Sequence, residues 1–316
     1  MKRAFVFPGQ GSQAVGMGRV LAATFAPARQ VFEEVDDALS QNLSRLMFEG
    51  PESELTLTAN AQPALLAASL AVIRILEAGG GFALARNAGF VAGHSLGEYS
   101  AIAAAGSVSI GEGARLLRLR GRAMQEAVPV GEGAMAALLG LDIEQGQAVA
   151  AEAAGPNQVC AVANDNAPGQ VVVSGHRQAV ERAIAIARAK GARRSIALPV
   201  SAPFHSPLMA PAADVMAEAL GRVALQQPAV PLVANVSATA TRDPGTIRRG
   251  LVEQVTAMVR WRESVLFLKQ EGVEEIVEIG AGRVLAGLAK RIDPGLAARS
   301  VGTPAEIESL INGIIG

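Results

Sequence analysis

Short apolar runs alternate with longer amphipathic stretches along this chain, and the alternation predicts strands and helices in turn. The runs Ala4–Phe7, Leu232–Val236 and Glu275–Ile279 have the length and residue types of buried strands, and helical patterns separate them. Strands that alternate with helices are typical of an α/β fold with a parallel sheet. The first run ends in the glycine-rich segment Pro8–Gln13, and a loop after the first strand is where such sheets place backbone that contacts ligands.

The middle of the chain, from residue 131 to residue 198, has a different pattern. Successive segments there predict strand, helix, strand, strand, helix and strand. Their expected bounds are Ala134–Leu139, Ile143–Ala154, Val159–Ala163, Gln170–Ser174, Gln178–Lys190 and Arg194–Leu198, with a turn over 165–169. This order is the signature of a ferredoxin-like (βαββαβ) unit. We therefore expect a small ferredoxin-like domain over 131–198, inserted into a larger domain formed by 1–130 and 199–316.

The pentapeptide Gly93–Gly97 reads Gly-His-Ser-Leu-Gly and lies between the apolar run Phe90–Ala92 and the helix-compatible stretch Glu98–Ala105. In a G-x-S-x-G sequence the small residues allow a sharp strand-to-helix turn that exposes the serine hydroxyl. The helix that follows points its free N–H groups at any oxyanion formed beside the serine. Ser95 is therefore the candidate nucleophile, and the main domain is predicted to be α/β-hydrolase-like.

Composition narrows the class of protein. The chain has 316 residues, of which 50% are hydrophobic and 3% aromatic, and its formal net charge is -1. A balance so close to neutral gives no electrostatic footprint for a nucleic acid, so we expect no nucleic-acid partner. The one cysteine, Cys160, has no partner for an internal disulfide, which fits a reducing compartment.

No targeting or membrane segment is predicted. Lys2 and Arg3 precede only the short run Ala4–Phe7, which is too short for the apolar core of a signal peptide. The longest apolar stretch, Ala64–Leu76, falls short of the roughly 20 residues of a membrane span and contains Arg74. We expect a cytoplasmic protein with no membrane partner.

A serine nucleophile needs a base, usually a histidine within hydrogen-bond reach. The chain has three histidines. His94 adjoins Ser95, but adjacent side chains diverge at such a turn, so a supporting role is expected. His176 opens a helix of the small domain and is interpreted as a solvated or capping residue. His205 lies where the chain re-enters the main domain and is the predicted base; the alternative is a loop histidine satisfied by backbone groups.

A carboxylate often orients the histidine, and in α/β hydrolases it lies between serine and histidine in chain order. Here Asp142 and Asp165 fall in the small domain, so neither is a good candidate for the carboxylate that orients the histidine. A Ser–His pair whose imidazole is held by a backbone carbonyl is more economical, because the third group need only fix the tautomer and the ring orientation.

The helix predicted over Arg115–Met124 carries one arginine that does not lie on its solvent-exposed face. At about 100° per residue, the polar face holds Arg115, Arg118 and Arg122. Arg120 falls instead on the apolar side, where a guanidinium keeps its proton and needs an anionic or hydrogen-bonding partner. Two interpretations stay open: a buried ion pair with a protein carboxylate, or a bidentate clamp for a carboxylate on the substrate.

Together these segments resemble the malonyl-CoA:acyl carrier protein transacylases of fatty-acid synthesis and the related acyltransferase domains of polyketide synthases. The resemblance covers essentially the whole chain. The matching segments are Phe5–Gln13, Gln62–Ala64, Gly93–Tyr99, Arg120-Gly121, Asn164 with Pro168–Gln170, Pro203–Ser206, Gln254 shortly before Trp261, and Glu278–Gly280.

The resemblance implies that Ser95 takes the malonyl group from malonyl-CoA and passes it to the phosphopantetheine thiol of an acyl carrier protein, without a metal or cofactor. His205 would be the base and Arg120 would hold the malonyl carboxylate. The oxyanion hole would be formed by the backbone N–H groups of Gln10 and Leu96.

The remaining site residues also come from the resemblance. His94, Gln62 and Asn164 would support the site, and Phe204 resembles the bulky residue of malonyl-selecting members. In the family a main-chain carbonyl orients the histidine, which points to Gln254. This chain departs from the family there, because Val255–Met258 replaces the commoner Tyr-Asn-Pro or Ser-Ser-Pro.

Two other functions remain as alternatives: a serine esterase or thioesterase that uses the same turn, and a non-catalytic scaffold. Arg120 separates the first from a transferase, because a simple esterase needs no buried cation. The face formed by Arg115, Arg118 and Arg122 either steers an acidic carrier or is an ordinary solvated helix face. We expect a monomer, and a stand-alone chain favours fatty-acid over polyketide synthesis.

Overall fold

Six strands form the larger sheet of the computed structural model, which describes residues 1–79, 81–200 and 202–315. In order across the sheet they are β10 (Ala297–Val301), β9 (Glu275–Ile279), β1 (Arg3–Phe7), β2 (Phe90–Gly93), β7 (Leu232–Val233) and β8 (Ala240–Thr241). Neighbouring strands are parallel except for the antiparallel pair β7 and β8. The predicted parallel sheet is confirmed.

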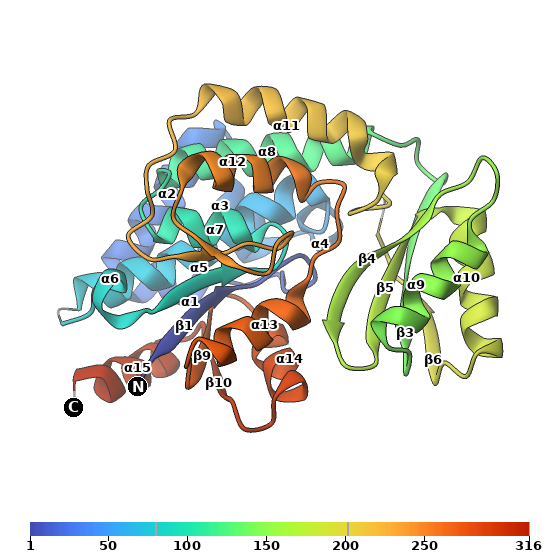
Figure 1. The fold of residues 1–316 in the computed structure, drawn as a ribbon. Helices are drawn as coiled ribbons and strands as arrows, with labels where there is room; N and C mark the ends of the chain where they lie inside the picture. The colour runs from blue at the N-terminus through green and yellow to red at the C-terminus, as the bar shows by residue number, and fades with distance from the viewer. Residues whose placement is uncertain (80, 201, 316) are drawn as a thin grey trace.

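Helices pack on both sides of this sheet (Figure 1). In chain order they are α1 (Arg19–Thr24), α2 (Ala26–Leu39), α3 (Leu43–Glu49), α4 (Glu52–Leu55), α5 (Thr58–Ala78), α6 (Leu84–Asn87), α7 (Gly97–Ala104), α8 (Ile110–Glu126), the 3₁₀ turn η1 (Pro207–Met209), α11 (Ala210–Arg222), α12 (Pro244–Glu253), α13 (Trp261–Gln270), α14 (Val284–Ile292) and α15 (Pro304–Ile315).

The side chains of β1 show how the two faces are filled. Phe5 and Phe7 join the core shared with α2, α5, α7 and α8, whereas Ala4 and Val6 join the core shared with α13 and α14. Successive side chains of a strand point to opposite faces, so all four are buried only if both faces are covered. This arrangement explains why the run was continuously apolar.

Helix α5 lies in the centre of the larger core. Of the described helices, it is the one long and apolar enough to cross a membrane by length and composition, but 83% of its most apolar window is buried inside the fold. A helix packed on all sides is apolar all round, and its composition follows from that position. Helix α5 begins at Thr58, and Pro63 removes one helical hydrogen bond within it.

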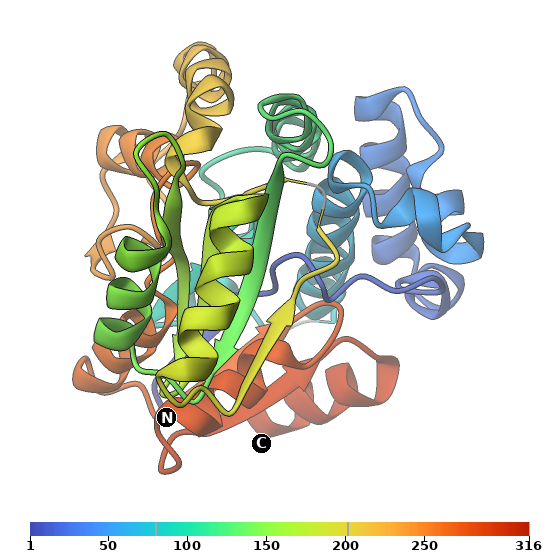
Figure 2. The same ribbon diagram turned by 90° about the vertical axis from the view of Figure 1, so that its right-hand side faces the viewer.

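The smaller sheet is formed by the middle of the chain. Its elements are β3 (Gly133–Leu139), α9 (Ile143–Ala153), β4 (Cys160–Ala167), β5 (Gln170–His176), α10 (Arg177–Ala189) and β6 (Arg194–Ala197). The strands lie in the order β4-β5-β3-β6 and all neighbours are antiparallel. Helices α9 and α10 cover the face turned away from the larger body (Figures 1 and 2). The ferredoxin-like prediction is confirmed, and we retain 131–198 as the proposed bounds of this domain.

The structure changes two local predictions in the small domain. The turn expected from Asp165 begins only at Pro168, because β4 continues to Ala167 and pairs along its edge with Val259 of the larger domain. His176 stands at the N-cap position of α10 and is partly exposed, but its side chain makes no cap bond: its Nδ1 accepts the backbone N–H of Val159 at 2.8 Å. In both cases the hydrogen-bond partner comes from another segment of the chain, which a local pattern does not reveal.

Candidate active site

The turn after β2 has the geometry of a nucleophile elbow. Ser95 lies in the left-handed region with φ 53°, a conformation that costs a non-glycine residue free energy. A Cβ on Gly93 would lie 1.9 Å from the carbonyl carbon of Gly97, and a Cβ on Gly97 would lie 2.2 Å from the carbonyl oxygen of Phe7. Strand and helix approach this closely only because both positions are glycine.

Asn235 holds this strained turn from the end of β7. Its Oδ1 accepts the backbone N–H of Ser95 at 2.8 Å, and its Nδ2 donates to the carbonyl of Gly93 at 2.6 Å. The strand predicted over Leu232–Val236 ends at Val233, and the chain then leaves the sheet and brings Asn235 to the elbow. Nothing in the sequence pattern marks this residue, because its partners lie about 140 positions earlier in the chain.

Ser95 and His205 form a hydrogen-bonded pair. The Ser95 Oγ lies 2.7 Å from His205 Nε2, and His205 Nδ1 lies 2.8 Å from the carbonyl oxygen of Gln254. A carbonyl only accepts, so Nδ1 carries the proton and Nε2 is free to accept from the serine. Burial, followed by the positive charge of Arg120, lowers the pKa of His205 to about 3. The imidazole is therefore neutral and ready to act as a base.

Arg120 is buried beside this pair, with 1% of its surface exposed. Its Nη1 donates to Gln62 Oε1 at 2.8 Å, and its Nη2 donates to Gln254 Oε1 at 2.8 Å and to the Ser95 Oγ at 3.1 Å. Burial lowers its pKa, but a guanidinium keeps its proton. Within the described residues no carboxylate forms an ion pair with Arg120. Of the two interpretations of this cation, the geometry favours an anionic substrate.

Gln254 connects the serine, the histidine and the arginine. Besides its bonds to His205 and Arg120, its Nε2 donates to the carbonyl of Ser95 at 3.1 Å and to Glu98 Oε2 at 2.5 Å. Glu98 is buried, and burial raises its pKa to about 7. The departure of the next four residues from the family pattern leaves this network intact, because it uses the backbone carbonyl and the amide of Gln254 itself.

The predicted residues converge on one cavity of about 420 Å³. All of them except Gln254 line it: Gln10, Gln62, His94, Ser95, Leu96, Arg120, Asn164, Phe204 and His205. The cavity therefore joins residues of the larger domain to Asn164 of the small domain, and Phe204 forms part of its lining.

His94 supports the cavity without touching the nucleophile. Its Nε2 pairs with Asn166 Oδ1 at 2.9 Å, and its ring lies 5.7 Å from that of Trp261. Burial lowers its pKa. Together with the ion pair of Asp165 and Arg262 at 2.8 Å, this bond fixes β4 to the larger domain. The link through Asn166 was missed, because that residue was expected in a turn.

The two predicted oxyanion donors have free N–H groups. Asn235 accepts the N–H of Ser95, whereas the backbone N–H groups of Leu96 and Gln10 have no acceptor among the described residues. Leu96 precedes the first turn of α7, where the partial positive charge of the helix terminus adds to its N–H. Both residues line the cavity that contains Ser95.

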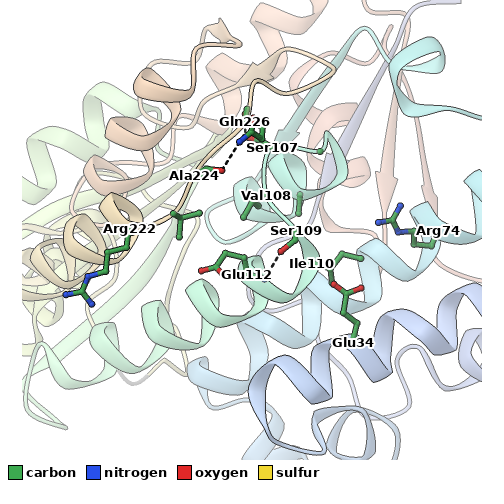
Figure 3. A pocket seen from close by; sticks show the side chains of 13 residues that line it. Glu34, Arg74, Ser107, Val108, Ser109, Ile110, Glu112, Arg222, Ala224 and Gln226 are labelled. Carbon is green, nitrogen blue, oxygen red and sulfur yellow. Dashed lines mark hydrogen bonds between the residues drawn. The ribbon is translucent and has the colours of Figure 1, made fainter.

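A second cavity, of about 590 Å³, lies between the start of α8 and the end of α11 (Figure 3). Its polar groups are engaged in local structure: Ser109 caps α8, Ser107 donates to the carbonyl of Gln226, and Glu34 accepts the N–H of Gly111. It contains no serine–histidine pair. Among the described residues no group of histidine, cysteine and carboxylate side chains could hold a metal ion.

Known proteins are similar to this chain in sequence. The family model described as "Acyl transferase domain" matches residues 4–299. The malonyl CoA-acyl carrier protein transacylase of Escherichia coli (strain K12) is 46% identical over 308 residues, 98% of each chain. That of Bacillus subtilis (strain 168) is 45% identical over 310 residues, 98% of this chain and 96% of the relative.

Solved structures agree with the sequence matches. The acyl-carrier-protein-S-malonyltransferase from Bartonella henselae superposes with a TM-score of 0.97 at 54% identity, over the whole of both chains. A malonyl-transacylase in complex with a holo type II polyketide synthase acyl carrier protein superposes with a TM-score of 0.95 at 44% identity, over 99% of this chain and 100% of the other. This chain therefore belongs to the malonyl-CoA:acyl carrier protein transacylases, within the acyl transferase domain family.

Proposed function

We propose that this protein transfers the malonyl group of malonyl-CoA to the phosphopantetheine thiol of an acyl carrier protein, through an acyl-enzyme on Ser95. The observation that carries the proposal is the contact between Arg120 Nη2 and the Ser95 Oγ at 3.1 Å, within a Ser–His pair. A buried cation at the nucleophile suits an acyl group that bears its own carboxylate. A simple esterase has no need of it.

In the first half of the reaction, the Ser95 Oγ attacks the thioester carbonyl while His205 Nε2 takes the hydroxyl proton. The carbonyl oxygen becomes an oxyanion, which accepts from the N–H groups of Gln10 and Leu96. The carbon–sulfur bond then breaks, the proton on Nε2 passes to the departing CoA sulfur, and a malonyl ester remains on Ser95. The carbonyl of Gln254 keeps the other ring nitrogen protonated throughout.

The second half repeats these steps in reverse order. The thiol of the carrier gives its proton to His205 Nε2 as its sulfur attacks the ester carbonyl, and the proton then returns to the Ser95 Oγ as the ester bond breaks. Both halves exchange one thioester with one ester, so the chain needs no metal or redox cofactor for either. Malonyl-CoA is a substrate and not a resident group.

The unused donors of Arg120 support a bidentate arrangement for the carboxylate. A guanidinium has five N–H groups, and three are engaged here, one on Nη1 and two on Nη2. Acylation turns the Ser95 Oγ into an ester oxygen, a weaker acceptor, and releases one Nη2 hydrogen. The released hydrogen and the second Nη1 hydrogen then bind the carboxylate bidentately, while Gln62 and Gln254 keep their bonds.

The setting of this reaction is also a proposal. We propose fatty-acid synthesis in the cytoplasm as the pathway and compartment, with the chain acting as a monomer. Phe204 forms part of the cavity wall and is the proposed barrier to branched acyl groups. Supplying malonyl-CoA and methylmalonyl-CoA in competition would test that barrier, which predicts a strong preference for the unbranched acid.

The experiment that tests the proposed function measures where the malonyl group goes. The protein is incubated with malonyl-CoA and a holo acyl carrier protein, and malonyl-carrier and free malonate are quantified over time. We expect carrier-bound product to exceed free acid by a wide margin. Rapid release of malonate with no carrier-bound product would instead establish a thioesterase.

The arginine face of α8 gives weak support for carrier docking. Arg115 is neutralised by an ion pair with Glu112 at 2.9 Å, and Arg118 is half-buried and donates to Gln41. The prediction that all three share a solvated face is wrong for Arg118, which packs toward α2.

A second group of arginines offers a less neutralised surface. Arg193, Arg194 and Arg291 are exposed around a cavity of about 590 Å³ between the small sheet and α14, and no acidic side chain of the described chain lines it. An acidic carrier would be steered to such a surface. Charge reversal at Arg193 and Arg194 should slow transfer to the carrier and leave acyl-enzyme formation unchanged. The same result from Arg115 and Arg122 instead would assign docking to α8.

A further inference from the structure

A chain of side-chain hydrogen bonds runs from the proposed carboxylate site to the proposed oxyanion hole. Arg120 Nη1 donates to Gln62 Oε1 at 2.8 Å, Gln62 Nε2 donates to Thr58 Oγ1 at 2.9 Å, and Thr58 Oγ1 donates to Gln10 Oε1 at 3.0 Å. Gln10 carries one of the two free N–H groups at the cavity. Neither the sequence pattern nor the proposed mechanism gave Thr58 a role.

The direction of every bond in this chain follows from its first member. A guanidinium only donates, so the oxygen of the Gln62 amide must face Arg120 and its nitrogen must face Thr58. The Thr58 oxygen thus receives a hydrogen from Gln62, and its own proton is left to point at Gln10. Donor and acceptor alternate without a conflict, which is the condition under which a buried polar network fixes its members.

Packing holds Thr58 and Gln62, the middle members of this series of hydrogen bonds, in fixed positions. Thr58 and Gln62 are each 1% exposed and stand one turn apart on α5. The partner helix α8 can approach this turn because residue 121 is glycine: a Cβ there would lie 2.6 Å from the Cα of Ala59 and 2.7 Å from the carbonyl oxygen of Thr58. The close packing of α8 against α5 therefore fixes the position of Arg120 relative to Gln62.

The Gln10 end of this series of hydrogen bonds is held by fewer contacts. Gln10 is exposed, in the loop that follows β1. Its own side chain is held by Thr58, and the next peptide is held only locally, by the bond from the Gly11 N–H to Gln13 Oε1 at 2.7 Å. An oxyanion donor must be placed to within a fraction of an ångström to be effective. An exposed loop needs an anchor on a rigid element to meet that requirement.

We propose that Thr58 is a positioning residue that anchors Gln10, and with it the oxyanion N–H, to the Arg120 site through Gln62. This role rests on the proposed function. It places the two ends of a malonyl thioester, the carboxylate and the reacting carbonyl, on one connected network. The residue acts through Gln10 and does not touch the reacting atoms.

The test replaces Thr58 with valine, which keeps the shape of the side chain and removes its hydroxyl. The single-turnover rate of acyl-enzyme formation from malonyl-CoA should fall about tenfold or more, since loss of a whole oxyanion donor costs roughly a hundredfold or more. The dissociation constant of malonyl-CoA should stay within twofold, because Arg120 keeps its place. Thr58→Ser restores the hydroxyl and should recover most of the rate.

A matched control is Thr24→Val. Thr24 is exposed at the end of α1 and does not line the active-site cavity, so loss of its hydroxyl should leave the rate unchanged. A second variant, Gln10→Leu, cuts the same link at its exposed end while keeping the backbone N–H. Its loss of rate should match that of Thr58→Val, and the double variant should be no slower than either, as expected for one shared interaction.

A wild-type rate in Thr58→Val or in Gln10→Leu would overturn the role of Thr58 and leave the proposed function standing. Equal losses in Thr58→Val and Thr58→Ser would also overturn it, since the hydroxyl would then not be the cause. If the unsubstituted protein forms no acyl-enzyme, the proposed function fails, and the role of Thr58 fails with it.

Discussion

Replacing Arg120 with alanine should convert a carboxylate-selective enzyme into a poor but unselective one. In the proposed acyl-enzyme Arg120 makes two charge-assisted hydrogen bonds to the malonyl carboxylate, each contributing about 1.5–3 kcal/mol. Their loss, roughly 3–6 kcal/mol, lowers kcat/KM for malonyl transfer by about 10²–10⁴-fold, at 1.36 kcal/mol for each factor of ten. An acetyl group makes neither bond, so its transfer loses neither.

The substitution also removes the bonds from Arg120 to Gln62, Gln254 and the Ser95 Oγ. That loss is common to both substrates and cancels in the ratio of kcat/KM for malonyl-CoA to kcat/KM for acetyl-CoA. The ratio is therefore the quantity to measure, with transfer to a holo carrier followed by release of CoA. Arg122→Ala, on the exposed side of the same helix, is the matched control and should leave the ratio unchanged.

Equal losses for malonyl-CoA and acetyl-CoA would refute the reasoning. Arg120 would then be a structural cation that organises Gln62 and Gln254, and selectivity would have to come from elsewhere in the cavity. A fall in the ratio would agree with a clamp for the carboxylate, whatever loss of rate the two substrates share.

Three other substitutions test the surroundings of the nucleophile. Gly93→Ala should prevent folding, since its Cβ would lie 1.9 Å from backbone, whereas Gly287→Ala, with open space around it, should fold normally by circular dichroism. Asn235→Ala should lower the free energy of unfolding in urea by about 2–4 kcal/mol, because it leaves two buried backbone groups of the elbow unpaired, and it should slow acylation of Ser95; unchanged values for both would remove its assigned role. His205 protonates near pH 6.5 when unfolded and near pH 3 when folded, so stability falls as the pH drops below about 6.5. Between pH 7 and pH 5 this residue alone should cost about 2 kcal/mol, and His205→Gln, measured in parallel, should lack that part of the loss.

Local pattern was sufficient for the residues whose roles depend on their own segment. The elbow at Ser95 is built by glycines two positions away, and the burial of Arg120 follows from the periodicity of one helix. The order of strands and helices predicted both sheets, because periodicity 2 and periodicity 3.6 reflect which face of an element is buried. These features depend on neighbours within a few residues.

Other parts of the site could not be predicted in this way. Asn235 and Glu98 act through partners more than 130 residues away, and nothing in their own segments marks them. The role of Gln254 toward His205 uses a backbone carbonyl, which any residue could supply, so side-chain patterns carry no signal for it. The turn expected at Asp165 became strand because an edge of the larger domain pairs with it.

The central claim is that malonyl is held as an ester on Ser95. Intact-mass spectrometry after exposure to malonyl-CoA, without a carrier, tests it most directly. We expect one malonyl adduct on the unsubstituted protein, none on Ser95→Ala, and its discharge when a holo carrier is added. A protein that never shows the adduct, or a Ser95→Ala variant that still acquires it, would contradict the claim.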